Sequence, residues 1–126
     1  MKVIIAGSRT IHDMNILIEA IKLSQFDITE VVSGNAKGVD RLGEAWGENH
    51  NVEISLFPAM WSLHGRAAGF RRNASMGKYA DALIAIWNGV SKKTAHMIRI
   101  AKQYKLKIYV HKVDVGPRFL EHSFLE

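Results

Sequence analysis

Short apolar runs alternate with stretches of helical periodicity along most of the chain. Apolar runs typical of buried parallel strands cover residues 2–6, 29–33, 52–57, 80–87 and 106–110. Between them, apolar residues recur every three or four positions, which predicts helices near residues 13–21, 39–50, 65–76 and 94–101. Asp13 is the expected N-cap of the first helix. In the third helix, the spacing directs Ala67, Phe70 and Ala74 inward.

Five strands alternating with four helices predict an α/β fold. Right-handed crossovers between successive strands give a single Rossmann-like domain, a doubly wound and mainly parallel five-stranded sheet with helices on both faces. We expect this domain to span residues 1–111. Residues 112–126 form a tail in which Gly116-Pro117 interrupts the pattern, and its apolar residues need cover. The tail is therefore expected to pack on the domain or on a second subunit.

Composition narrows the classes of function. The chain has 126 residues, enough for one domain, and no cysteine, which excludes disulfides, thiolate metal sites and cysteine nucleophiles. The six histidines lack ligand spacing, so neither a metal site nor a cofactor is predicted. No apolar run approaches the roughly 18 residues of a membrane span and no signal-peptide pattern is present, which predicts a cytoplasmic protein without membrane contact. A net charge of +5 favours an anionic partner or only a basic, solvated surface.

The turn between the second strand and the second helix is the first candidate for chemistry. Gly34 and Gly38 allow a sharp turn and a close approach of the backbone to a ligand. The helix that follows presents unpaired N–H groups and its positive dipole end to the same space. Lys37 and Arg41 add full positive charges there. The turn therefore predicts an anion site, and a phosphate is the expected anion.

Other turns are expected to meet this one, because ligands of open parallel sheets bind at the carboxyl ends of the strands. The predicted ligand- and phosphate-binding residues are Gly7, Ser8, Arg9, Ser33, Gly34, Lys37, Gly38, Asp40, Arg41, Arg72, Asn73, Gly89, Ser91, Lys93 and Thr94. Trp61 and Trp87 flank the same edge and are candidates for stacking on a base.

Several of these residues also have a purely structural interpretation. Arg9 could form a salt bridge with Asp40 instead of binding a ligand. Asp40 could complement the helix dipole, orient Arg41 or bind a ribose hydroxyl. The two tryptophans could cover the edge of the core, and Arg72 with Asn73 could form the polar side of the third helix. Lys93 could be a solvated surface residue.

Four segments carry a resemblance to a known family. Ala6–Arg9, Ser33–Arg41, Ala68–Met76 and Tyr79–Ser91 resemble the motifs of the SLOG superfamily, named for the DNA-processing protein DprA (Smf) and the cytokinin-activating LOG enzymes. The chain is most similar to the YspA-like, YpsA-related branch of small stand-alone domains, over roughly residues 2–111. The resemblance implies a Rossmannoid fold, a nucleotide or nucleotide-derived ligand at the glycine turns, and a homodimer.

One position departs from the LOG pattern. The LOG enzymes carry a glutamate that serves hydrolysis of a nucleotide's N-glycosidic bond, and Met97 stands at the matching position here. Methionine can neither move a proton nor stabilise an oxocarbenium-like centre. Lys93 likewise replaces a glycine of that motif, while Thr94 matches its threonine. No catalytic residue is therefore assigned.

Three functions follow, in order of preference. The first is binding of a phosphorylated nucleotide or nucleotide-derived ligand, such as one containing ADP-ribose, for sensing or sequestration. The second is a LOG-like nucleotide N-glycosidase or phosphoribohydrolase with altered catalytic residues. The third is binding of single-stranded nucleic acid, which ranks lower because the charge is expected to cluster at strand ends rather than along one exposed stripe.

Overall fold

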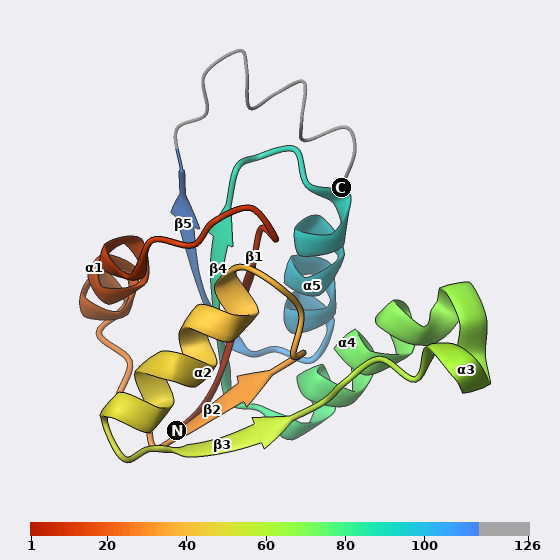
Figure 1. The fold of residues 1–126 in the computed structure, drawn as a ribbon, viewed down its shortest axis with the longest axis horizontal. Helices are drawn as coiled ribbons and strands as arrows, with labels where there is room; N and C mark the ends of the chain where they lie inside the picture. Colours follow the sequence, from red (N-terminus) through yellow and green to blue (C-terminus); the bar gives the residue numbers. More distant parts are fainter. Residues whose placement is uncertain (114–126) are drawn as a thin grey trace.

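The sheet and the helices follow the predicted alternation. The computed structural model describes residues 1–113. The strands are β1 (Lys2–Gly7), β2 (Glu30–Ser33), β3 (Glu53–Leu56), β4 (Ala82–Trp87) and β5 (Lys107–Lys112). The helices are α1 (Met14–Ser24), α2 (Val39–Asn49), α3 (Trp61–His64), the 3₁₀ turn η1 (Gly65–Ala67), α4 (Ala68–Tyr79) and α5 (Lys92–Gln103), arranged as in Figure 1.

All five strands are parallel, in the order β3-β2-β1-β4-β5. The order reverses at β1, which pairs with β2 on one side and with β4 on the other. Ile4, for example, is in register with both Val32 and Leu83. The predicted α/β Rossmann-like sheet is therefore confirmed, and the site predicted at its carboxyl edge falls where such folds bind ligands.

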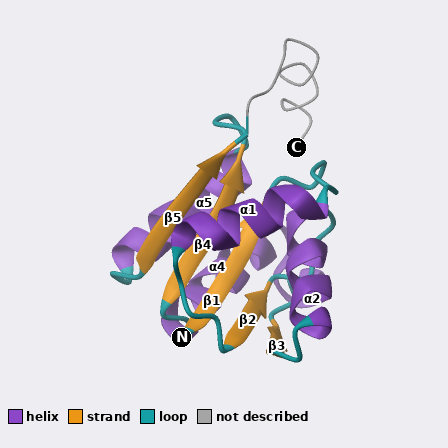
Figure 2. Cartoon of the chain, turned by 90° about the vertical axis from the view of Figure 1, so that its left-hand side faces the viewer, coloured by secondary structure: helices purple, strands orange, loops and turns teal. Residues whose placement is uncertain are grey.

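Helices cover both faces of the sheet (Figure 2). On one face, Val3, Ile5 and Val31 pack with α1 and α2 through Leu17 and Val39. On the other face, the intervening residues of the same strands pack with α4 and α5. The largest fully buried side chains of these two helices are Met76 and Met97. Strand residues alternate between the two cores because successive side chains of a strand point to opposite faces.

The third predicted helix differs from the structure in its start and in its buried side. A short α3 and a 3₁₀ turn precede α4, whose buried residues include Ala68, Asn73 and Met76. Ala67 and Phe70 were expected inward, but Ala67 is exposed and Phe70 is 56% exposed. This prediction was wrong because the buried side of α4 includes the polar Asn73. Apolar spacing alone therefore predicts that a neighbouring side of the helix is buried.

Two local features fix the ends of the elements. Asp13 caps α1 as predicted, since its Oδ1 accepts a hydrogen bond of 2.9 Å from the Asn15 amide. β5 ends at Lys112, the first residue assigned to the tail, and Val113 packs against the core. Residues 114–126, with the other apolar residues of the tail and their expected packing, lie outside the described residues. Within residues 1–113, no helix has the length and apolar character needed to cross a membrane.

Candidate functional site

A cavity of about 460 Å³ lies beyond the carboxyl ends of β1 and β2, between α2, α4 and α5. It collects residues from the turns that follow β1, β2 and β3 and from the start of α5. The predicted residues that line it are Gly7, Arg9, Gly34, Lys37, Asp40, Arg41, Trp61, Arg72, Asn73, Lys93 and Thr94. The convergence arises because parallel strands end at one edge of the sheet, where their following turns meet.

Ser8, Ser33 and Gly38 do not line the cavity and instead hold the two glycine turns in place. Ser8 is buried, and its carbonyl accepts a hydrogen bond of 3.1 Å from the Val39 amide. The Ser33 hydroxyl donates to Glu44 Oε2 at 2.6 Å and accepts from the Asn35 amide at 3.0 Å. Gly38 has a φ of +77° and lies against the backbone of Ser8, so no other residue fits.

The turn between β4 and α5 is also closed by its own hydrogen bonds. Ser91 caps α5, its hydroxyl accepting a bond from the Thr94 amide. The Asn88 side chain accepts a bond of 2.8 Å from the Ser91 amide, and Trp87 donates from Nε1 to the Ser91 carbonyl at 3.1 Å. Gly89, Ser91 and Trp87 lie outside the cavity lining. From this turn and the start of α5, only Lys93 and Thr94 of the predicted residues line the cavity.

The first turn of α2 differs from the expected anion site. Its amides were expected to be unpaired, but the Val39 amide donates to the Ser8 carbonyl, and in the turn before the helix the Ala36 amide donates to Asp40 Oδ2 at 3.2 Å. The buried Asp40 carboxylate thus lies where the helix dipole attracts negative charge. A phosphate in this cavity would be bound by cationic side chains, since Asp40 already complements the helix end.

Asp40 is the one carboxylate among the described residues that line the cavity. Burial raises the pKa of Asp40 to about 6, against the opposing effects of the Ala36 amide and the Arg72 guanidinium. The nearby Glu44 raises that pKa further, and Arg41 lowers it. The described residues contain no ion pair between Arg9 and Asp40, so the alternative salt bridge is absent.

Arg72 crosses from α4 to the Gly34 turn. Its Nη1 donates to the Gly34 carbonyl at 2.6 Å, and its Nε donates to Asn73 Oδ1 at 3.0 Å. A Cβ on Gly34 would lie 2.6 Å from Arg72 Nη1 and 2.9 Å from Asp40 Oδ2, so the glycine leaves room for both groups. The guanidinium is thereby held at the cavity wall with donors remaining for a ligand.

The bond from Arg72 also determines the state of His96, which the sequence analysis did not assign to the site. Arginine can only donate, so Asn73 Oδ1 is the acceptor and Asn73 Nδ2 must be the donor in its 3.0 Å contact with His96 Nδ1. The imidazole is therefore neutral, with its proton on Nε2. Burial, and then the charge of Arg99, lower the pKa of His96, in agreement with a neutral ring.

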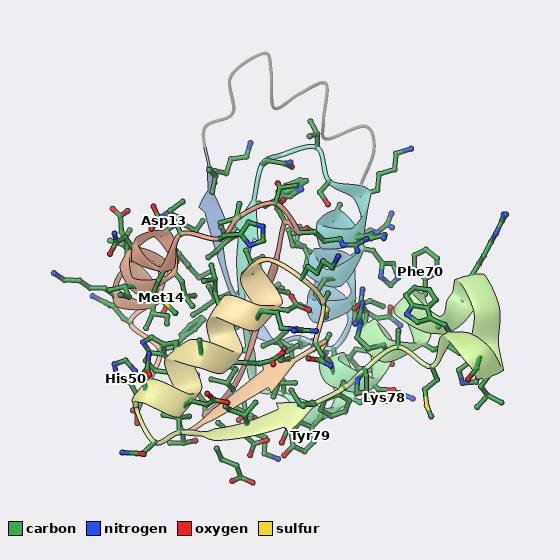
Figure 3. The ribbon with its side chains drawn as sticks, viewed as in Figure 1. Asp13, Met14, His50, Phe70, Lys78 and Tyr79 are labelled. Carbon is green, nitrogen blue, oxygen red and sulfur yellow. The ribbon has the colours of Figure 1, made fainter. Side chains whose placement is uncertain are left out.

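The outer wall of the cavity comes from α3 and α4, which the sequence analysis partly missed. Trp61 is 58% exposed. The Phe70 ring, labelled in Figure 3, lies edge-on to His96 with centroids 4.5 Å apart. Arg66 from the 3₁₀ turn also lines the cavity. Phe70 lies three residues before Asn73, and residues three apart on a helix are neighbours on its surface. Helical spacing from the predicted site residue Asn73 could therefore have identified Phe70.

The comparisons with known proteins agree with this architecture. The sequence model of the YspA, cpYpsA-related SLOG family matches residues 1–64, which end with α3. The Gene 61 protein of Mycobacterium phage D29 is 35% identical over 112 residues, covering 81% of this chain and 89% of that protein. No solved structure matches the chain.

Proposed function

The chain belongs to the YspA, cpYpsA-related SLOG family, and we propose that its cavity binds a phosphorylated nucleotide or nucleotide-derived ligand. The observation that carries this proposal is the convergence of five exposed cations on one cavity: Arg9, Lys37, Arg41, Arg66 and Lys93. None of them forms an ion pair within residues 1–113, so their charges are available to a phosphate.

The remaining lining supports a nucleotide rather than inorganic phosphate alone. Trp61 and Phe70 provide exposed aromatic surface on which a base can stack. Arg72 and Asn73 supply fixed donors, and Asp40 supplies an acceptor for a hydroxyl or amino group. A cavity of about 460 Å³ is in the size range of small-molecule sites.

Titration calorimetry tests the proposal with AMP, ADP and ADP-ribose, and with inorganic pyrophosphate for comparison. We expect a nucleotide to bind more tightly than pyrophosphate, and Arg9→Gln to weaken that binding. Lys22→Gln, on the exposed surface of α1, is the control and should leave it unchanged. The absence of binding at millimolar concentrations of every ligand would overturn the proposal.

The alternative hydrolase function has less support in the geometry. Met97 lines the cavity and is buried, so α5 contributes no carboxylate where LOG enzymes use a glutamate. Asp40 is the remaining candidate acid, and it already accepts the Ala36 amide. Chromatography of the same nucleotides after incubation should show no free base, and release of base would favour the hydrolase instead.

A further inference from the structure

The two helical layers differ in charge. In α1 and α2, acidic residues such as Glu19 and Glu48 are interspersed with basic ones. Asp81 is the single acidic residue between Trp61 and Lys112, and its carboxylate accepts a bond of 2.8 Å from the Lys2 backbone amide. The layer formed by α4 and α5 therefore contains cations and no carboxylate in either helix.

The two helices of this layer lie side by side and run in the same direction. Asn73 of α4 contacts His96 of α5, and about one turn later on α4 Gly77 lies against Ile100 and Tyr104. The outward positions carry exposed cations in two rows. These rows, the basic face, are formed by Arg71 and Lys78 in α4 and by Lys92, Arg99 and Lys102 in α5.

No residue of the basic face forms an ion pair within the described part of the chain, where the one ion pair joins His111 to Glu19. The sequence analysis expected the charge to cluster at strand ends, but the structure also arranges it along two parallel helices. Residues seven apart on a helix, such as Arg71 and Lys78, are separated by about 10 Å along its axis. None of the residues of the basic face lines the cavity, so these cations are not part of the nucleotide site.

We propose that the basic face binds the phosphate backbone of single-stranded nucleic acid. The rows begin at the cavity edge, where Phe70 and Trp61 expose aromatic rings that can stack on unpaired bases. Polar residues, Ser75 and Gln103, accompany the cations on this face. A run of phosphates matches rows of cations, and the exposed rings favour single strands over duplexes.

Fluorescence anisotropy of a labelled 20-nucleotide oligo(dT) tests the proposal across a salt series from 25 to 200 mM. The test variant is Lys78→Gln/Arg99→Gln, because neither residue lines the cavity (Figure 3 labels Lys78). The matched control is Asn15→Glu/Lys22→Gln, which removes the same net charge from exposed positions of α1. Losing two phosphate contacts should reduce the slope of log K against log salt by about 1.4.

We expect the wild type and the control to bind the single strand more tightly than a duplex of equal length, and the test variant to bind it weakly. Equal weakening by the control, or absence of binding at 25 mM salt, would overturn the proposal. Binding to an acidic peptide or to anionic vesicles in place of the oligonucleotide would overturn it too. The test variant should still bind mononucleotides, so this result is independent of the cavity's function.

Discussion

The two walls of the cavity are built by different means. The wall formed by the glycine turns, from Gly7 to Arg9 and from Gly34 to Arg41, is held by backbone contacts, such as the Val39 amide with the Ser8 carbonyl. The wall formed by α3 and α4 consists of side chains, several of them exposed. We infer that the glycines of the first wall, the glycine wall, mainly support folding, while the side chains of Arg9, Lys37 and Arg41 there, together with those of the helical wall, determine what binds. Substitutions in each wall should separate stability from affinity.

The largest effect is expected at Gly38. Gly38→Ala places a Cβ at a φ of +77°, within 2.3 Å of the Ser8 carbonyl oxygen, where the backbone cannot give way cheaply. Urea denaturation should show a loss of roughly 4 kcal/mol in the free energy of unfolding. Gly65→Ala is the control, because its φ is also positive but nothing lies within 4 Å, so a loss of only about 1 kcal/mol is expected. Equal losses would contradict the account of the glycine wall.

The next effect is a pH dependence due to Asp40. Between the ordinary pKa of 3.8 and the folded pKa of about 6, the folded protein holds a proton that the unfolded chain has lost. The contribution of Asp40 to the free energy of unfolding is therefore highest below pH 4. It declines by about 3 kcal/mol as the pH rises through 6. Asp40→Asn lacks this dependence.

Subtracting the unfolding free energy of the Asp40→Asn variant from that of the wild type isolates the contribution of Asp40, because other carboxylates cancel. The difference should fall by about 2.4 kcal/mol between pH 4 and pH 7.5. A difference that is constant over this range would show that burial does not raise the pKa of Asp40.

On the helical wall, Arg72→Gln should reduce nucleotide affinity, and it should also lower stability because the bond to the Gly34 carbonyl is lost. Loss of one charge-assisted bond to a phosphate costs about 2 kcal/mol, or roughly thirtyfold in Kd by calorimetry. Arg71→Gln removes the same charge from the neighbouring exposed position outside the cavity and should change Kd less than twofold. Similar losses in both variants would mean that only the overall charge matters.

The smallest effect is expected at Trp61. Trp61→Ala should weaken a nucleotide by about 1 kcal/mol, near fivefold, because one stacking surface is lost, and should leave pyrophosphate binding unchanged. Leu63→Ala removes another exposed apolar side chain of α3, one that does not line the cavity, and serves as the control. Weakening of both ligands by Trp61→Ala would instead indicate that α3 supports the wall structurally.

The strand pattern, the order of elements and the glycine turns can be predicted from the sequence, because each depends on local periodicity or on a backbone conformation that glycine permits. These signals place Gly7, Gly34 and Arg9 at one edge of the sheet, and all three line the cavity there. The prediction for Phe70 was wrong, since apolar spacing cannot reveal that a helix buries the polar Asn73 in its place. Trp87 was counted with the site because a position beside a strand end does not show which way a side chain turns.

The α/β architecture, the glycine turns and the excess of positive charge follow from the amino-acid sequence alone. Three properties of the site follow only from the folded arrangement: Asp40 occupies the α2 end, Arg72 is tied to Gly34 through a bond between residues 38 apart, and His96 is neutral. The folded arrangement also brings the unpaired cations of α4 and α5 onto one face. These properties depend on contacts between distant segments, and hence on burial and distance, which no local pattern encodes.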